Sequence, residues 1–317
     1  MPVSSKTTIR AFVASGVTVG FRSLIAVVTF FYILRSTSES GVAAYGVLMF
    51  IWSISHAFVN NLVAQPLIDQ KRLRTIDVSS ARSCALLAAA SISFLLYISS
   101  DYLNLAYPNL VDLDENLNIL IWLTPISVLG LVEMALAQRH MQFKQLAYGQ
   151  SFATLISCTS AILISFENKI IGLIIIQALI PPAYLLYTFR KNTRYRLHFN
   201  LQSIAKLSGV GRHLALDGVL AVSVMQGPVV MFGLFLATAE LAIFVAISRS
   251  IQLIAAQLGR VAALLTTPII RRVKEHENRL HQTILTTAFI SNGLVLLPLI
   301  IIICYPCLLY TSPSPRD

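Results

Sequence analysis

Apolar stretches of about 20 residues recur along nearly the whole chain, and each is long enough to cross a hydrocarbon core of roughly 30 Å. Lipid offers backbone groups no hydrogen-bond partners, so such stretches must be helices, and they lack the alternation of barrel strands. With 56% hydrophobic and 12% charged residues, the chain is too apolar for a soluble domain. We therefore predict an all-α polytopic membrane protein with about nine transmembrane helices. The expected spans lie near Ala11–Leu34, Val42–Ala64, Ala81–Ile98, Leu117–Ala137, Leu146–Phe166, Ile170–Phe189, Leu214–Leu236, Leu241–Ile269 and Thr283–Tyr305.

The basic residues fall almost entirely on one side of these spans. Of the 24 Lys and Arg residues, 17 lie at the N-terminus and in every second connection, whereas the opposite connections hold only Arg35 and Lys169. The connection Ser99–Asn116, on that opposite side, carries acids and no base. Cytoplasmic connections of membrane proteins are rich in Lys and Arg. We therefore predict a cytoplasmic N-terminus, and we attribute the net charge of +10 to topology rather than to nucleic-acid binding.

The end of the chain differs from the rest. The segment Cys307–Asp317 resembles translated sequencing-adapter read-through, with a disordered Ser/Pro tail as the alternative. We expect the natural protein to continue past Pro306, and residues 307–317 do not enter the functional argument. The four cysteines are too scattered to predict a disulfide framework or a metal site.

Arg22 lies in the middle of the first predicted span, far from both ends. A charge at that depth costs at least about 2.5–3.5 kcal/mol, so it must be compensated or useful. Ser15, Thr18 and Thr29 follow helical spacing and share its face. Two interpretations stay open: Arg22 lines a polar cavity, or it is paired with a structural carboxylate or with carbonyl groups.

Two further arginines, Arg249 and Arg260, lie in the eighth predicted span. Their spacing is almost three helical turns, so both face the same way about 16 Å apart. Gln252 and Gln257 flank that face. We predict that the face lines a cavity, although Arg260 can alternatively reach the cytoplasmic surface by snorkelling.

Other polar residues of the predicted spans are candidates for binding or for ion coupling. His56 and Asn60 share one face of the second span and either line a cavity or bond neighbouring helices, and His56 is also a candidate proton relay. Glu133 and Asp217 lie near cytoplasmic span ends. Each acid is a candidate for pairing with an arginine or for coupling transport to H⁺ or Na⁺, and a solvated structural role is equally open.

Motifs of catalytic sites are not found in the sequence. It contains no phosphate-binding loop, dinucleotide fingerprint, zinc-protease helix or nucleophile elbow. The longest candidate segment outside the membrane, Arg190–Arg212, is basic and lacks any carboxylate. We therefore expect a protein that is not an enzyme and that needs no cofactor other than a coupling ion.

The stretch Gln138–Ala147 contains Arg139, Met141, Phe143 and the pair Leu146-Ala147. This arrangement is similar to an Arg–x–Met–x–Phe–x–x–Leu–Ala string at the cytoplasmic turn between the fourth and fifth spans of the polysaccharide-biosynthesis (Wzx-like) flippases of the MOP superfamily.

Two other segments support the resemblance. Leu34-Arg35, Glu39 and Tyr45-Gly46 resemble the first hairpin of that family, with extra residues between them, and Thr267–Arg272 resembles its exit from the eighth span. The resemblance covers nearly all of Ile9–Pro306. The family's Trp-Ala-Leu pattern around the sixth span is absent here.

The resemblance implies two six-helix lobes around a central cavity. Residues 1–200 would then be the first six-helix transmembrane lobe, and residues 201–306 part of the second. It also implies alternating access that moves an undecaprenyl-pyrophosphate-linked oligosaccharide across the bacterial inner membrane, as in O-antigen and lipopolysaccharide assembly. The implied partners are this lipid-linked oligosaccharide, membrane lipids and other polysaccharide-assembly proteins.

Arg22, Arg249 and Arg260 suit a pyrophosphate headgroup because a guanidinium binds phosphate bidentately and stays charged. The leading alternative is an ion-coupled drug or metabolite exporter of the same superfamily, whose cavity would present carboxylates and aromatic rings. A membrane sugar polymerase or ligase would need a large external catalytic loop. Three embedded arginines against two interfacial acids favour the flippase.

Overall fold

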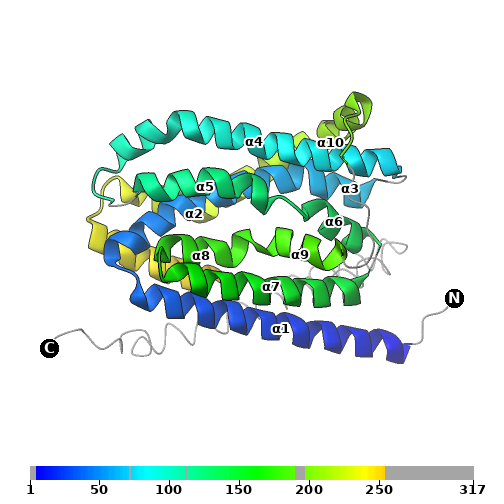
Figure 1. Cartoon of the computed structure of the whole chain (residues 1–317), viewed down its shortest axis with the longest axis horizontal. Coiled ribbons are helices and arrows are strands. Elements are labelled where there is room, and N and C mark those ends of the chain that lie inside the picture. Colours follow the sequence, from blue (N-terminus) through cyan, green and yellow to red (C-terminus); the bar gives the residue numbers. More distant parts are fainter. Residues whose placement is uncertain (1–4, 71–72, 111–112, 141, 190–196, 254–317) are drawn as a thin grey trace, which may run out of the picture. The chain divides into compact units, whose positions relative to one another are not determined.

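The computed structural model describes residues 5–70, 73–110, 113–140, 142–189 and 197–253, and all regular structure in these ranges is helical (Figure 1). A further helix begins at residue 238 and reaches the end of the described residues. The labelled elements are α1 (Ser5–Ser36), α2 (Glu39–Val59), the π-helix η1 (Asn60–Ala64), α3 (Gln65–Asp69), α4 (Thr75–Ala106), α5 (Leu113–Ser127), α6 (Leu131–Arg139), α7 (Phe143–Ser165), α8 (Lys169–Ala178), α9 (Ile180–Phe189) and α10 (Leu201–Gly233).

Five helical segments of the described chain are long and apolar enough to cross a membrane, and a bent pair of helices adds a sixth. They correspond to the second to seventh predicted spans, which confirms the prediction of an all-α polytopic membrane fold. The first predicted span lies within α1, the eighth begins in the helix from residue 238, and the ninth lies outside the described residues. The spanning segments are Glu39–Ile68, Thr75–Ala106, Leu113–Arg139, Gln145–Ser165, Gly211–Gly233 and the pair Lys169–Ala178 with Ile180–Phe189.

The helix α4 extends beyond both ends of its predicted span, Ala81–Ile98. Its start is held by a capping box, in which the backbone N–H of Arg74 donates to Oδ2 of Asp77 over 3.0 Å. The predicted external connection Ser99–Asn116 is therefore largely helical. Hydropathy marks only the apolar middle of a helix, whereas helical hydrogen bonding continues through polar interfacial residues.

The helix α10 begins at Leu201, well before the predicted start of its span at Leu214. The side chain of Asn200 accepts hydrogen bonds from the backbone N–H groups of Gln202 and Ser203, which satisfies two donors of the first turn. The second half of the basic segment Arg190–Arg212 is therefore helical rather than a loop.

Two spans are broken, and their breaks lie against each other. The fourth span is interrupted between α5 and α6, where Gly130 has a φ of +91°, a left-handed conformation that favours glycine. The sixth span bends by 50° between α8 and α9. A Cβ atom on Gly130 would collide with the carbonyl oxygen of Pro181, so only glycine allows this close packing.

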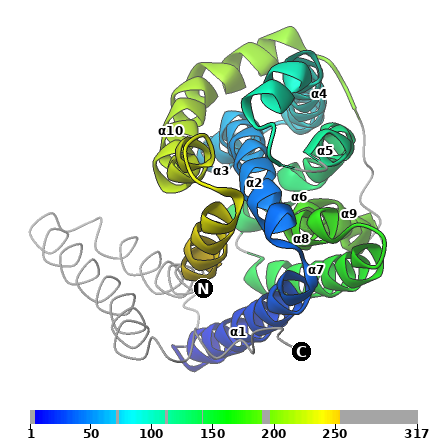
Figure 2. The same ribbon diagram turned by 90° about the vertical axis from the view of Figure 1, so that its left-hand side faces the viewer.

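The chain divides into two compact units, Gly20–Ser248 and a second unit of Met1–Val19 with Arg249–Asp317. Within the first unit, α2 lies in the middle, between α10 on one side and α5 and α8 on the other (Figure 2). The predicted division into lobes at residue 200 stays a prediction.

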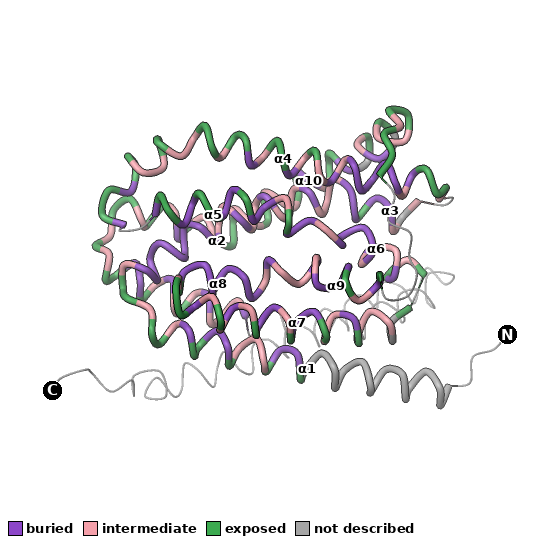
Figure 3. The backbone as a smooth tube through the Cα atoms, in the orientation of Figure 1, coloured by how far each residue is buried: buried purple, intermediate pink, exposed green. Residues whose placement is uncertain are grey.

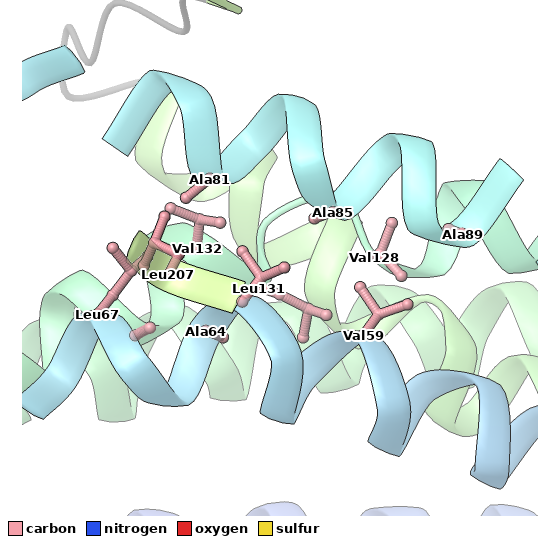
Figure 4. Packing of buried hydrophobic residues seen from close by; sticks show 12 residues of the cluster. Val59, Ala64, Leu67, Ala81, Ala85, Ala89, Val128, Leu131, Val132 and Leu207 are labelled. Atoms are coloured by element: carbon pink, nitrogen blue, oxygen red, sulfur yellow. The ribbon is translucent and has the colours of Figure 1, made fainter. Parts of the chain in front are cut away.

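Burial within this first unit distinguishes central helices from peripheral ones. The most apolar stretch of the second span is 61% buried, whereas that of α4 is 22% buried (Figure 3). Many aromatic and aliphatic side chains of α4 are exposed. One face of α4 nevertheless packs tightly, because Ala81, Ala85 and Ala89 bring it close to the second span and to α6 (Figure 4). Lipid would cover the remaining face of α4.

Candidate functional site

Arg22 is buried on α1, with 8% of its surface exposed. Its Nη1 donates a hydrogen bond to Oε1 of Gln150 on α7. Thr29, two turns along α1, is also buried and its side chain contacts Cys158 of the same neighbouring helix. The polar face predicted for the first span thus lies against α7 over this part. The amide of Gln150 is neutral, so this contact orients the guanidinium without cancelling its charge.

Arg82 on α4 is also buried, and its partner, unlike that of Arg22, is a carboxylate. Nε of Arg82 on α4 donates to Oε1 of Glu133 on α6 over 2.7 Å, and both side chains are almost fully buried. Glu133 was predicted to pair with an arginine or to couple an ion, but Arg82 was not singled out from the sequence. The helices α4 and α6 belong to neighbouring antiparallel spans. Arg82 lies about 10 Å after the start of α4 and Glu133 about 9 Å before the end of α6, so the two side chains can reach the same depth. That matching depth was the signal that could have revealed the pair.

His56 and Asn60 occupy different environments although both lie along the second span. The ring of His56 stacks on Trp52, with centroids 4.9 Å apart, and its Nε2 is buried without a partner among the described residues. Asn60 opens the π-helix η1, and its Nδ2 donates to Oδ1 of Asn61 over 3.3 Å. A π-turn inside a helix is often found at functional sites.

The second span and α10 form an antiparallel pair along their length. Gln226 donates from Nε2 to Oγ of Ser53 over 3.2 Å, and a Cβ atom on Gly211 would collide with the carbonyl oxygen of Leu62 in η1. Small residues let membrane helices approach closely. The interface therefore combines close backbone packing at one end with a polar contact nearer the other.

Two hydrogen bonds join α10 to the ends of α4. At one end, Oγ of Ser203 donates to Oδ1 of Asp77 over 2.7 Å. At the other, the hydroxyl of Tyr107 donates to the carbonyl oxygen of Val230 over 2.9 Å. Burial raises the pKa of Tyr107 above its usual value, so this donor stays protonated. The helix that begins the predicted second lobe is thus connected to the third span at both ends.

Two basic residues, Arg139 and Lys169, donate hydrogen bonds to carbonyl oxygens at the ends of helices. Nη1 of Arg139, from the motif shared with the flippases, donates to the carbonyl oxygens of Leu67 and Ile68 at 2.7 and 3.2 Å. Lys169, one of the two bases on the predicted outer side, donates from Nζ to the carbonyl oxygen of Ser36 at the end of α1. Positive charge is favourable at the C-terminus of a helix, which explains this exception to the charge distribution.

The other predicted site residues are not brought together by the described structure. Asp217 is exposed on α10. Arg249, in the second unit, is buried and donates from Nη1 to Oε1 of Gln252 over 3.1 Å. Gln257 and Arg260 lie outside the described residues, so their roles stay predictions. No group of three or more His, Cys, Asp or Glu side chains lies together in the part of the chain that the structure describes, so that part offers no metal centre.

These elements define a multi-pass α-helical membrane protein with charged side chains buried between its spans. A family model described as polysaccharide biosynthesis protein matches residues 34–309, and the chain therefore belongs to this family. Membership confirms the family predicted from the motifs, and it fits a flippase or transporter-like role rather than a catalytic one. No curated protein and no solved structure matched the chain.

Proposed function

We propose that the protein is a flippase that moves an undecaprenyl-pyrophosphate-linked oligosaccharide across the bacterial inner membrane by alternating access. The headgroup would cross through a cationic cavity while the lipid tail stays in the bilayer. Arg22 would bind the pyrophosphate, and Arg249 and Arg260 of the eighth predicted span are further candidates for binding it.

The observation that carries this proposal is the contact between Arg22 and Gln150 in a chain of a polysaccharide-biosynthesis family. A guanidinium binds the oxygens of a phosphate in a planar, bidentate arrangement. Gln150 is neutral and orients the guanidinium, so this contact adds no negative charge beside Arg22. A cavity for organic cations would need carboxylates instead, and the buried carboxylate of Glu133 is already paired with Arg82.

Alternating access also requires that contacts between the two predicted lobes can open. The bonds of α10 to α4, from Ser203 to Asp77 and from Tyr107 to Val230, are single hydrogen bonds. Each is worth only about 1 kcal/mol net, or up to roughly 3 kcal/mol where a carboxylate accepts. These two bonds are therefore a small part of the cost of opening, because α10 also packs along the second span.

The orientation follows from the distribution of Lys and Arg, with the N-terminus in the cytoplasm. Cysteine labelling tests it directly: a cysteine at Asn109, exposed beyond the end of α4, should react from outside the cell, and one at Gln138 of α6 should not. Equal labelling from outside at both positions would contradict the orientation.

Glycan export in a flippase-deficient bacterial strain tests the function. The full-length gene should restore surface polysaccharide, whereas the same gene with Arg22→Ala should restore none although the protein accumulates in the membrane. Arg35→Ala is the matched control, because Arg35 lies on the same helix and is exposed. Restored export by Arg22→Ala would overturn the role of Arg22, and failure of the unaltered gene with every tested glycan would overturn the flippase.

A further inference from the structure

The helix α10 packs along the second span in two halves that differ in the kind of contact (Figure 2). In the half predicted to lie nearer the cytoplasm, a Cβ atom on Gly211 would collide with the carbonyl oxygen of Leu62, and one on Gly218 would collide with the side chain of Asn61. The two glycines are about two helical turns apart and therefore share one face of α10. Asn61 and Leu62 belong to the π-helix η1, so this inner half fits two glycines of α10 against η1.

The contact at Gly211 joins two backbones. Because glycine lacks a Cβ atom, a Cα hydrogen of Gly211 takes its place and faces the oxygen of Leu62. Weak contacts of this kind recur between closely packed helices, and small residues are what let membrane helices approach so closely. Parting the helices here would separate backbone from backbone, which no rotation of a side chain can relieve. We therefore expect the inner half to stay closed.

In the outer half, the same two helices meet through atoms at the ends of side chains. Nε2 of Gln226 donates to Oγ of Ser53 over 3.2 Å. A Cβ atom on Gly46 of the second span would lie 2.9 Å from Cγ1 of Val229. An amide or a methyl group can turn away without moving its backbone, so the outer half can open more easily than the inner half.

A weak point of α10 lies between the two halves, at Gly227-Pro228. Proline has no N–H to donate to the preceding turn, and its ring crowds a carbonyl group there. Glycine adds conformational freedom to the backbone. No described heavy atom lies within 4 Å of the place that a Cβ atom on Gly227 would take, so packing does not require glycine at this position.

The segment after this weak point, residues 229–233, is held to α4 and to the following helix. The hydroxyl of Tyr107 donates to the carbonyl oxygen of Val230 over 2.9 Å, and its ring lies 3.0 Å from the Cβ position of Gly233. The ring of Phe232 meets that of Phe244 edge to face, with centroids 5.0 Å apart. The segment and the start of the next helix can therefore move together, and Tyr107 can hold them.

We propose that residues 229–233 of α10 form a gate that turns about Gly227-Pro228, while the inner half of α10 stays on η1 as the pivot. When the gate is closed, Tyr107 holds it against α4. When it opens, the contacts that are lost involve side chains, and the backbone packing at Gly211 is kept. The gate lies at the end predicted to face outside. Its use in releasing a substrate there rests on the proposed function, and its test uses no glycan.

Spin-label distances measure both ends of this interface in the full-length protein in lipid nanodiscs, with the native cysteines replaced by serine. Labels at Glu39 and Phe235 report the outer end, and labels at Gln65 and Leu201 report the inner end; all four residues are exposed. We expect two distances at the outer end and one at the inner end. Tyr107→Phe removes a hydrogen bond of the closed gate and should raise the ratio of open to closed protein by roughly fivefold.

Two alanine variants form a matched pair for the hinge. Gly209 and Gly227 both lie in α10, and a Cβ atom at either position meets no described heavy atom within 4 Å. Gly227→Ala reduces the freedom of the backbone beside Pro228, so it should lower the ratio of open to closed protein by roughly fivefold. Gly209→Ala makes the same change away from the hinge and should leave both distance distributions as they are.

Three results would each overturn part of the proposal. A single outer distance in both the unaltered protein and Tyr107→Phe would overturn the gate. An inner distance that changes as much as the outer one would overturn the pivot, and equal effects of the two alanine variants would overturn the hinge. Failure of glycan export in a protein whose outer distance responds as expected would contradict the proposed function and leave the gate standing.

Discussion

Arg22 on α1 and Arg82 on α4 are buried to nearly the same extent, at 8% and 6% exposed, yet they meet the cost of burial differently. Arg82 forms an ion pair with Glu133 across 2.7 Å. Arg22 donates to the neutral amide of Gln150. The difference is that a carboxylate neutralises Arg82, whereas the contact of Arg22 with an amide orients its guanidinium, although both arginines look alike as single charges in an apolar span.

Arg82→Ala should have the largest effect on the folded state. The change leaves the carboxylate of Glu133 buried without its counter-charge, and breaking a buried ion pair costs roughly 3–5 kcal/mol. Thermal unfolding of purified protein in detergent should show this loss, with a lower folded yield. The double variant Arg82→Ala with Glu133→Ala should recover most of it, because no unpaired charge remains. A single variant as stable as the parent would show that the pair is solvated.

Arg22→Ala should affect function more than folding. Hydrogen bonds to charged groups are worth about 1.5–3 kcal/mol, so binding of a pyrophosphate-bearing lipid should weaken by roughly ten- to a hundredfold. Folded protein should be retained because removal of a costly charge does not harm the helix. If folded protein instead falls as far as it does in Arg82→Ala, Arg22 has a structural role like that of Arg82.

Gln150→Glu should give Arg22 a carboxylate partner, as Arg82 has in Glu133. The new carboxylate would pair with Arg22 and cancel the charge offered to the ligand. We expect binding of a pyrophosphate lipid to fall by up to about tenfold while thermal stability is kept or raised. Gln145→Glu, at the start of the same helix α7, is the control and should bind normally. Unchanged binding in Gln150→Glu would indicate that Arg22 does not contact the ligand through this face.

Replacing Arg82 or Arg22 by lysine should give the smallest effects and should distinguish the structural role of Arg82 from the ligand-binding role proposed for Arg22. Lysine keeps the positive charge but loses the planar fork of arginine. Arg82→Lys should lose less stability than Arg82→Ala, because a point charge still neutralises Glu133. Arg22→Lys should keep part of the export activity with normal folded protein. Loss of export equal to that of Arg22→Ala would show that the bidentate geometry, not the charge, is what the ligand needs.

The similar depths of Arg82 and Glu133 could have suggested the ion pair, but hydropathy offered a simpler explanation for Arg82. Arg82 lies one residue inside the predicted start of its span, where a base is ordinarily explained by the membrane surface. Its partner is 51 positions away on another helix, and Gln150 is 128 positions from Arg22. Which of several polar residues faces a given arginine depends on helix rotation and packing, which hydropathy does not contain.

Helix ends and breaks likewise depend on packing that hydropathy does not contain. Proline marks possible kinks in the sequence, but the break in the fourth span lies at Gly130, which has a left-handed φ and lies too close to Pro181 of another span for a side chain. The capping of α4 and α10 extends both helices well past their apolar centres. Local hydropathy therefore placed the second to seventh spans correctly and misplaced the ends of several of them.

By itself, the sequence determined that the chain is helical, crosses a membrane several times and belongs to a polysaccharide-biosynthesis family. These properties depend on local quantities, namely the length of apolar stretches, the backbone's need for internal hydrogen bonds in lipid, and short motifs. Only the tertiary structure decided that Arg82 is neutralised by Glu133, that Arg22 meets an amide, and that the broken fourth and sixth spans pack against each other. The physical reason is that a buried charge finds its partner across helices, where packing of the whole fold sets the distance.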